Sequence, residues 1–346
     1  MSSAAPLADR NGGSTLRFWV NDASAPSFRH RLRSVEPELV RRGFLCSTDA
    51  FPRRRYGLRV LERLRDVRAT DLLIVAKLKL MPGERALVRR AARRLVYDVD
   101  DAVYLGKPAA PGLPPDRSAW RMAKFAATCG IADVVVAGNE VLADAARRVA
   151  RRVEVVPTPI DVGRYRICRP ALPGHRLVWI GSPGNLQYLE PLHSVLSVLA
   201  RQFTGFRFRV ICSRFPDWND VPIERVPWSE ETHAADLAAS DIGLMPLTDD
   251  EWARGKCAFK LLQYMAAGLP CVTSPVGANA TVAVPGVTAF FARDASEWYR
   301  ALGALLSSPE RRRAMGEAGR QRVEKLYDLG GIARRVADLY QELVLS

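Results

Sequence analysis

The chain lacks the features that mark several large classes of protein. No stretch of its 346 residues approaches 18 uninterrupted apolar positions, so we expect no transmembrane helix. The opening segment, MSSAAPLADRNGGST, has no apolar core and no basic leader. We therefore expect a flexible lead-in over residues 1–14 and no secretory signal. With 48% hydrophobic and 25% charged residues, the composition is that of a globular protein.

Cysteines and histidines are few and scattered. The six cysteines form no CxxC or HxxC group, and the four histidines show no metal-ligand spacing. We therefore expect no metal site and no bound cofactor, and reduced, buried thiols in a cytoplasmic protein. The cysteines lie at positions 46, 129, 168, 212, 257 and 271, and the histidines at positions 30, 175, 193 and 233.

The formal charge of +14 is unevenly placed. Residues 1–172 hold 32 Lys and Arg against 18 Asp and Glu, whereas residues 173–346 hold 19 of each. Basic runs at 53–55, 59–68 and 89–94 carry much of the excess. Such a surface attracts anionic lipid, nucleic acid or a phosphorylated acceptor. An Arg-rich solvated surface from a biased composition explains the same charge, and both interpretations stay open.

Short apolar runs alternate with helical patterns through both halves of the chain, which predicts mostly parallel α/β sheets. Expected strands in the first half are 16–20, 72–76, 95–99, 134–137 and 153–156, with helices at 28–42, 83–94 and 140–151. In the second half they are 177–180, 206–212, 223–226, 242–246 and 271–274, with helices at 186–202, 231–240, 256–267, 295–306, 310–327 and 332–343.

The proline-rich segment 157–175 separates the two series and predicts an interdomain linker. We expect an N-terminal acceptor-side domain over 1–168 and a C-terminal donor domain over 169–330. We expect residues 331–346 to form a last helix that packs back toward the N-terminal domain.

The stretch GKCAFKLLQYMAAGLPCVTSPVGAN, residues 255–279, is the most informative part of the chain. It predicts a helix ending at Gly268, then a buried strand and a glycine-containing loop. Lys256 and Lys260 are spaced i,i+4 near the start of the helix. Free backbone N–H groups and two ammonium groups together suit a phosphorylated ligand.

The run YMAAGLPCVTSPVGAN, with DIGLMPL upstream, resembles the donor-site region of retaining glycosyltransferases of family 4. The resemblance implies the GT-B architecture, in which two Rossmann-like domains face a central cleft. It implies transfer of a hexose from a nucleotide diphosphate sugar to a hydroxyl acceptor, with no metal. Asp241 in DIGLMPL is expected to be structural.

Two residues depart from the family pattern of glutamate, seven residues and glutamate. On the register of MAAGLP, the glutamate that contacts the donor sugar is replaced by Gly255, and the one that holds the ribose by Gln263. The Gln263 amide can still bond a ribose hydroxyl. Gly255 offers no side chain, and Asp249, Asp250 or Glu251 stand as substitutes just upstream.

The remaining donor-side candidates follow strand ends of the second half. A loop containing Gly181, Ser182 and Asn185 follows the strand 177–180 but lacks the Arg and Lys that the family places there, so Lys256 and Lys260 are expected to meet the diphosphate. Trp228 is a candidate for the nucleotide base, or else a core residue. Ser274 and Gly277 match a family loop at the cleft.

On the acceptor side, the strand 95–99 ends in the acidic run Asp98-Val99-Asp100-Asp101, in which Asp98 and Asp100 form an Asp-x-Asp pair. An Asp-x-Asp pair holds a metal in the other major glycosyltransferase architecture, but here the resemblance aligns Asp100-Asp101 with a His-Asp pair. We expect Asp100, Asp101 and Lys260 to act in catalysis, while a helix-capping role stays open for the aspartates. Ser27, Arg29 and Asn139 are expected on the acceptor or phosphate side, and Thr158 shapes the cleft.

The expected function is thus a glycosyltransferase of polysaccharide biosynthesis. The expected acceptor is a glycan or a lipid-linked or anionic molecule, reached from a peripheral place at the inner membrane face. The alternative is a non-catalytic relative that binds a nucleotide sugar or a polysaccharide, because both signature glutamates are absent. Nucleic acid is not expected, since no aromatic-interleaved basic motif is present.

Overall fold

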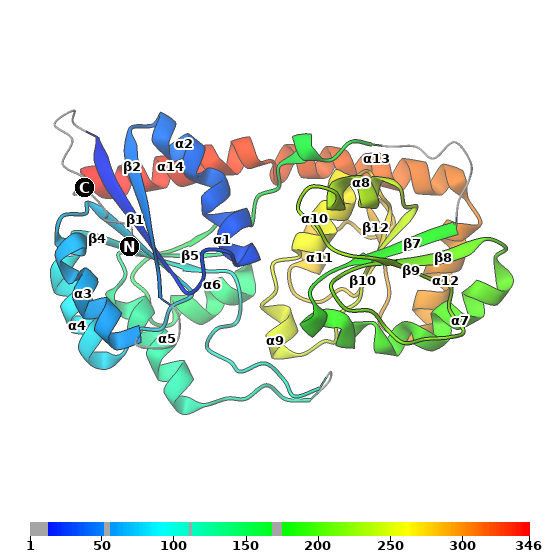
Figure 1. The fold of residues 1–346 in the computed structure, drawn as a ribbon, viewed down its shortest axis with the longest axis horizontal. Helices are drawn as coiled ribbons and strands as arrows, with labels where there is room; N and C mark the ends of the chain where they lie inside the picture. The colour runs from blue at the N-terminus through cyan, green and yellow to red at the C-terminus, as the bar shows by residue number, and fades with distance from the viewer. Residues whose placement is uncertain (1–12, 52–55, 111–112, 168–174) are drawn as a thin grey trace.

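The computed structural model describes residues 13–51, 56–110, 113–167 and 175–346. The lead-in up to residue 12, the basic run 53–55, Cys168 and the expected domain boundary at 168/169 lie outside these residues. The described chain forms two lobes joined side by side (Figure 1). Each lobe is built on a six-stranded sheet, so the α/β expectation is confirmed.

The N-terminal sheet has the strand order β2-β1-β3-β4-β5-β6, and every pairing is parallel. Alternate strand residues point to opposite faces of the sheet. Since the central strands are apolar at successive positions, both faces of the sheet are apolar, and both are covered by helices. The strands are β1 (Ser14–Val20), β2 (Phe44–Ala50), β3 (Leu72–Ala76), β4 (Arg94–Val99), β5 (Val134–Ala137) and β6 (Val153–Val155).

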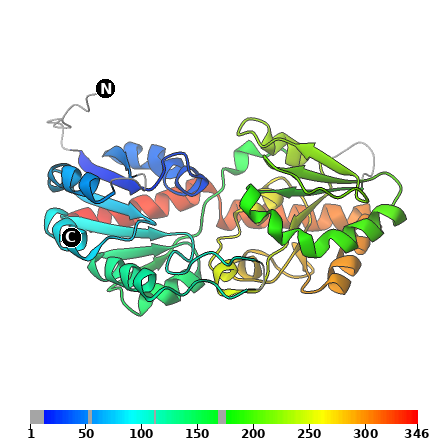
Figure 2. The same cartoon turned by 60° about the horizontal axis from the view of Figure 1, so that its bottom comes forward.

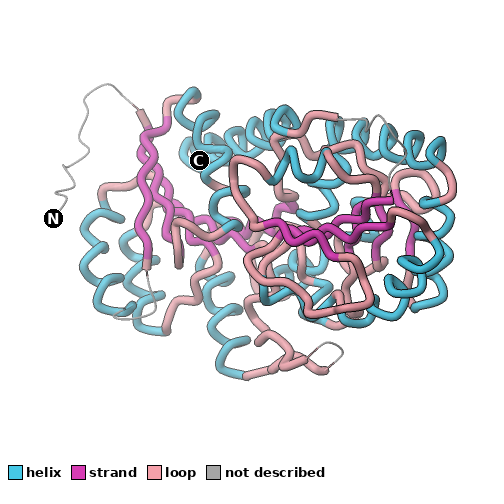
Figure 3. The backbone as a smooth tube through the Cα atoms, turned by 45° about the vertical axis from the view of Figure 1, so that its right-hand side comes forward, coloured by secondary structure: helices cyan, strands magenta, loops and turns pink. Residues whose placement is uncertain are grey.

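The C-terminal sheet has the order β12-β11-β10-β7-β8-β9, again with parallel pairing throughout. In both lobes the strands form a central layer between helices (Figure 3). The strands are β7 (His175–Ile180), β8 (Phe206–Ile211), β9 (Ile223–Val226), β10 (Ile242–Met245), β11 (Cys271–Thr273) and β12 (Ala289–Phe291).

Helices cover both faces of each sheet and leave the strand ends free for ligands. In the N-terminal lobe, α1 (Pro26–Arg31), α2 (Glu36–Arg41) and α14 (Leu329–Leu345) share a core on one face. The other face carries α3 (Tyr56–Arg68), α4 (Pro82–Ala91), α5 (Ala119–Ile131) and α6 (Glu140–Arg147). In the C-terminal lobe, one face carries α7 (His193–Gln202) and α12 (Ala295–Leu306), and the other α8 (His233–Ala238), α10 (Phe259–Ala266), α11 (Asn279–Val282) and α13 (Pro309–Leu326).

The chain crosses between the lobes twice. The first crossing comes before residue 160, because Ile160, Val162 and Tyr165 already belong to the core of the C-terminal lobe. After α13 the chain returns, and α14 packs on the N-terminal sheet beside α2 (Figures 1 and 2). Its Leu343 carbonyl accepts a hydrogen bond from Arg94 at 2.8 Å. None of the helices in the described ranges has the length and apolar character needed to cross a bilayer.

Three expected helices are broken or shorter, each for a local reason. The helix expected at 28–42 is divided into α1, a 3-10 turn (Arg33–Val35) and α2, because Pro37 cannot continue a helix. The helix expected at 186–202 begins only at His193, after two 3-10 turns that contain Pro183 and Pro191. The helix expected at 256–267 begins at Phe259, because Ala258 has a left-handed backbone with φ of 53°. The strands β2 and β12 and the helices α3, α5, α9 (Glu251–Arg254) and α11 were not predicted.

Candidate functional site

A cavity of about 380 Å³ lies between the two lobes at the carboxyl ends of the C-terminal strands. We call it the donor cavity. In parallel α/β sheets ligands bind at this edge. Seven of the residues selected from the sequence line it, namely Arg29, Gly181, Ser182, Asn185, Trp228, Lys260 and Gln263. They come from both lobes, so the cavity depends on how the lobes meet.

Lys260 lies on the first turn of α10 and reaches under the loop that follows β7. Its ammonium lies 5.5 Å from the centre of the Trp179 ring. A Cβ at Gly181 would fall 2.6 Å from that ring and 2.8 Å from Lys260 Cε, so only glycine fits beside the lysine. Burial and the nearby ammonium of Lys256 lower the pKa of Lys260 to about 7. Among the described residues no carboxylate forms an ion pair with Lys260, so an anionic ligand would favour its charged form.

Lys256 does not lie on the helix, so the predicted i,i+4 helical pair is wrong. The lysine belongs to the loop before α10, and its ammonium lies 5.7 Å from the centre of the Tyr188 ring. Burial lowers the pKa of Lys256, the cations of Lys107 and Lys77 add to the lowering, and the Asp101 carboxylate opposes it. Positive charge is thus gathered from both lobes. Lys107, missed in the sequence, donates to the Gly184 carbonyl at 2.7 Å across the cleft.

Gln263 is buried on α10, in a chain of side-chain hydrogen bonds. Its amide nitrogen donates to the Tyr165 hydroxyl at 3.2 Å, and that oxygen lies 3.3 Å from His233 Nε2. The Tyr165 contact fixes the orientation of the amide, with Gln263 at the wall of the donor cavity. Contact with a ribose stays a prediction.

Trp228 follows β9 and is 39% exposed, so it is not a core residue. The guanidinium of Arg29, from α1 of the other lobe, lies 5.2 Å from the centre of its ring. Arg29 also forms an ion pair with Glu230. Arg29 therefore occupies the aromatic end of the donor cavity, where it is paired with Glu230.

Ser274 and Gly277 serve the backbone and do not line the donor cavity. The buried Ser274 hydroxyl accepts from the Leu247 amide at 3.1 Å. Gly277 has φ of 53°, and a Cβ there would lie 2.3 Å from the Arg254 carbonyl oxygen. The upstream acidic residues are also engaged elsewhere: Asp250 caps α9 (Glu251–Arg254), Asp249 pairs with Arg254 at 2.6 Å, and Glu251 pairs with Arg117.

On the N-terminal side, Asp100 and Asp101 share one lysine that was not predicted. Lys77 Nζ lies 2.9 Å from Asp100 Oδ1 and 2.8 Å from Asp101 Oδ2. Burial opposes the charge on Lys77, but the two carboxylates outweigh it and raise its pKa. Burial raises the pKa of Asp100. An ammonium thus occupies the place that a metal would take between the carboxylates.

Lys77 comes directly after β3, at the same sheet edge as Asp100, and this position is the signal that could have found it. Its φ of 59° is left-handed, which is unusual for a lysine and aims the side chain at the aspartates. A smaller cavity of about 210 Å³ beside it is lined by Ser27, Lys77, Asp98 and Asp100 among others. Behind it, Arg31 and Asp98 form a buried ion pair at 2.7 Å.

Asn139 joins the lobes. Its side-chain oxygen caps α6, and its Nδ2 donates to the carbonyls of Gly255 and Lys256, both at 3.1 Å. Cys257 Sγ lies 3.2 Å from the Asp100 carbonyl oxygen. Thr158, near the first crossing between the lobes, is also buried. Asn139 therefore positions the segment 255–257, and nothing in this geometry gives it a direct ligand contact.

Gly255 is pressed against the other lobe. A Cβ at this position would lie 2.7 Å from Ala102 Cβ and 3.0 Å from the Ala102 amide nitrogen. A glutamate at residue 255 therefore cannot be accommodated in this arrangement of the lobes. Where the resemblance places a sugar-binding carboxylate, this chain has a backbone contact between its two domains.

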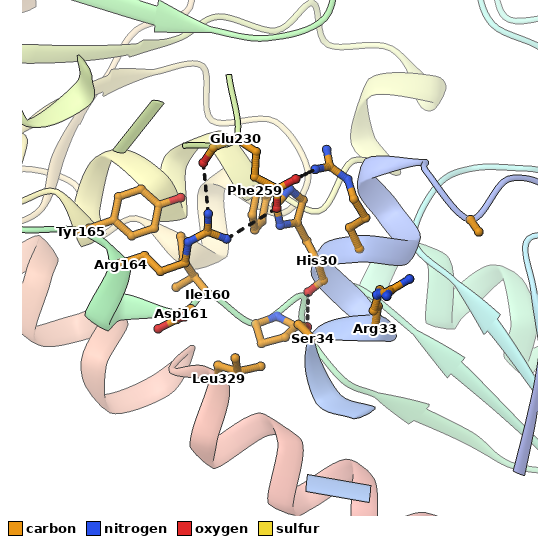
Figure 4. A pocket seen from close by; sticks show the side chains of 13 residues that line it. His30, Arg33, Ser34, Ile160, Asp161, Arg164, Tyr165, Glu230, Phe259 and Leu329 are labelled. Atoms are coloured by element: carbon orange, nitrogen blue, oxygen red, sulfur yellow. Dashed lines mark hydrogen bonds and ion pairs between the residues drawn. The ribbon is translucent and has the colours of Figure 1, made fainter. Parts of the chain in front are cut away.

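A second cavity, of about 460 Å³, adjoins the donor cavity and shares Arg29, His30 and Phe259 with it. We call it the hinge cavity, since it lies where the chain has just crossed between the lobes. Its lining includes Pro159, Ile160, Asp161, Arg164, Tyr165 and, at the start of α14, Leu329 (Figure 4). The rings of His30 and Phe259 stack at 4.4 Å. Burial, and next the charge of Arg29, lower the pKa of His30 to about 4, so His30 is neutral at neutral pH.

Residues 193–338 match a family model described as glycosyl transferase-like. The match covers less than half of the chain. A comparison with curated proteins gives no match.

The fold resembles several solved structures at low sequence identity. Sucrose-phosphate synthase from Thermosynechococcus elongatus is 14% identical with a TM-score of 0.72, over 95% of this chain and 99% of that one. Anabaena HepE in complex with UDP-glucose is 12% identical with a TM-score of 0.70, over 95% and 99%. WaaG, a glycosyltransferase involved in lipopolysaccharide biosynthesis, is 14% identical with a TM-score of 0.69, over 94% and 99%. With its two parallel sheets and facing strand edges, the chain has the GT-B fold of these glycosyltransferases.

Proposed function

We propose that this chain is a hexosyltransferase that takes a sugar from a nucleotide diphosphate and transfers it to a hydroxyl acceptor. The observation that carries the proposal is the donor cavity itself. It combines the Lys260 ammonium, the glycine loop after β7 and the exposed ring of Trp228. A nucleotide diphosphate needs a cation, close backbone approach and an aromatic surface. The similar fold of HepE, whose structure was solved with UDP-glucose bound, supports a ligand of this class.

In this proposal the diphosphate is the leaving group, and Lys260 and Lys256 stabilise the charge that develops on it. The bond between the sugar C1 and the diphosphate oxygen breaks while the acceptor oxygen bonds C1 on the same face. The acceptor proton passes to the departing diphosphate oxygen, which balances the step with retention of configuration. In this proposal Asp100, whose carboxylate lies 2.9 Å from Lys77 Nζ, binds a hydroxyl of the acceptor or of the sugar.

The proposal requires no metal, since ammonium groups face both the carboxylates and the phosphate region. The acceptor is proposed to be a glycan or a lipid-linked or anionic molecule, and the involvement of WaaG in lipopolysaccharide biosynthesis supports an acceptor of this kind. The basic first half of the sequence supports an anionic acceptor, reached from a peripheral place at the inner membrane face.

The test is a thermal-shift screen of UDP, GDP, ADP and dTDP and their sugars, with EDTA or Mg²⁺. We expect one nucleotide series to stabilise the protein, equally in both conditions. Lys260→Ala should abolish the shift, because the cation facing the diphosphate is lost. The matched control is Lys325→Ala, an exposed lysine on α13.

The sugars of any nucleotide that stabilises the protein are then used as donors in a turnover assay with glycan and lipid-linked acceptors. The anomeric configuration of the product is determined by NMR. A shift that survives in Lys260→Ala would mean that the nucleotide binds elsewhere. Stabilisation without transfer or hydrolysis of any donor sugar would favour a binding protein instead of an enzyme.

A further inference from the structure

The aromatic end of the donor cavity holds an arginine where a base would stack. Arg29 lies over the Trp228 ring at 5.2 Å and pairs with the Glu230 carboxylate. A guanidinium over an aromatic ring that also donates an N–H to a carboxylate is a strong local arrangement. Arg29 comes from the other lobe, so the lobes meet through this contact.

Glu230 has a second basic neighbour besides Arg29. Arg164 Nη1 lies 3.8 Å from its carboxylate, and Arg164 Nη2 donates to the Glu230 backbone carbonyl at 3.1 Å. Figure 4 shows the Arg164 side chain pointing toward Glu230, with Phe259 and His30 close by. Since Glu230 is 44% exposed at the hinge cavity, a ligand can reach it once Arg29 moves.

We propose that the donor base is guanine, and that Arg29 occupies its place when no nucleotide is bound. Guanine carries the same planar pair of donors as a guanidinium, since its N1–H and N2–H₂ groups lie side by side on one edge. Stacked on Trp228, that edge can donate two hydrogen bonds to Glu230, where Arg29 donates one from Nη1. The proposal rests on the proposed function, because it assigns the base end of the same nucleotide site.

Other bases fit this site less well. Uracil and thymine present one N–H between two carbonyl oxygens, which a carboxylate repels. Adenine presents one amino group beside a ring nitrogen that is itself an acceptor, as Glu230 is. The hinge cavity beyond the His30 and Phe259 rings adds room for a purine. Charge and space both favour guanine.

The test is isothermal titration of the full chain with GDP, IDP, UDP and ADP. IDP differs from GDP only in lacking the N2 amino group. We expect GDP to bind at least about tenfold more tightly than UDP or ADP, and IDP about five- to tenfold more weakly than GDP, since one bond to a carboxylate is lost.

Glu230→Gln should remove the advantage of GDP over UDP while changing UDP affinity less than about threefold, because only the base contact is altered. Glu231→Gln is the matched control, because the Glu231 carboxylate lies in the same loop and accepts a hydrogen bond from the Ser229 hydroxyl. Arg29→Ala should strengthen GDP binding about threefold, because the competing guanidinium is removed.

Equal binding of GDP and IDP, or UDP binding more tightly than GDP, would overturn the guanine assignment. If one of these results is found and UDP binding is lost in Lys260→Ala, the proposed function stands while the guanine assignment fails. Absence of binding by all four nucleotides would reject both. Weaker GDP binding in Arg29→Ala would mean that Arg29 holds the nucleotide and does not stand in for it.

Discussion

The two strand edges that face each other across the cleft carry charge in opposite ways. On the N-terminal edge, Asp98 pairs with Arg31, and Asp100 and Asp101 share Lys77, so each of these charges has a partner of opposite sign. We call this the balanced edge. On the C-terminal edge, Lys260 and Lys256 sit partly buried with lowered pKa values. One edge is complete without a ligand, whereas the other keeps positive charge in a costly environment.

The difference separates charges that hold the fold from charges that wait for a ligand. Removing a charge from the balanced edge leaves its partner buried and uncompensated, which lowers the free energy of unfolding. Removing a lysine from the other edge relieves a desolvation cost and loses binding instead. Substitutions on the two edges should therefore act on different quantities, and this can be measured.

The largest effect is expected from Asp98→Asn. Arg31 and Asp98 are both nearly fully buried, and Arg31 also donates to the Val156 carbonyl at 2.7 Å. Burial alone would lower the pKa of Arg31, but the Asp98 carboxylate raises it above its ordinary value. Losing that carboxylate should cost about 3 kcal/mol of unfolding free energy, measured by urea denaturation.

The control for this substitution is Asp144→Asn, which breaks an exposed pair with Arg147 and should cost less than about 0.5 kcal/mol. If both substitutions cost the same small amount, the N-terminal edge is not held together by its buried pair, and the contrast between the edges fails.

A smaller loss is expected from Lys77→Met, because Lys77 and Asp101 are partly exposed. Two carboxylates then face each other without a cation, and we expect a loss of about 2 kcal/mol by the same measurement. Adding Asp100→Asn should restore more than half of it. A double variant no more stable than the single one would show that Lys77 acts through something other than these carboxylates.

Lys77 also shows what sequence reasoning could and could not find. The buried strands were predicted well, because short apolar runs such as Leu72–Ala76 coincide with β3. The rule that ligand-binding residues follow parallel strands selected Asp100 and Trp228, and applied once more it selects Lys77. What the sequence does not contain is the pairing across the cleft. Lys107 meeting Gly184, and Arg29 meeting Trp228, depend on how two domains close.

Gly255 illustrates the same limit from the other side. In the sequence it is only the absence of an expected glutamate. In the structure a Cβ at this position would lie 2.7 Å from Ala102 Cβ in the other lobe. Glycine is therefore needed here for the two lobes to meet. Likewise, the helix start near Lys256 was misplaced because a left-handed Ala258 has no propensity signal. Local patterns predict elements, while contacts between distant segments require the fold.

A third prediction concerns the pH dependence of nucleotide binding at the unbalanced edge. Without a ligand the pKa of Lys260 is about 7, and a bound diphosphate favours the charged form and raises it. Above that pKa the lysine must take up a proton in order to bind. Affinity should therefore fall by up to about tenfold between pH 7.5 and 8.5, followed by titration calorimetry. Lys260→Met should bind weakly with no such slope. A slope that persists in this variant assigns the titration to another group.

The smallest expected effect is the reverse of the first, a gain in stability from Lys260→Met. The pKa of Lys260 lies near 7 in the folded chain, against 10.5 as its ordinary value. Between these two values the unfolded chain binds the proton that the folded chain releases, so stability rises with pH across this window. Below it the desolvation cost is fully present.

Methionine keeps the aliphatic contact with Trp179 and removes the charge, so we expect about 1 kcal/mol of added stability at pH 6 and none near pH 10. Urea denaturation at both pH values measures this, with Lys325→Met as the control. A loss of stability at pH 6 would place Lys260 among the charges that hold the fold, and the two edges of the cleft would then be alike.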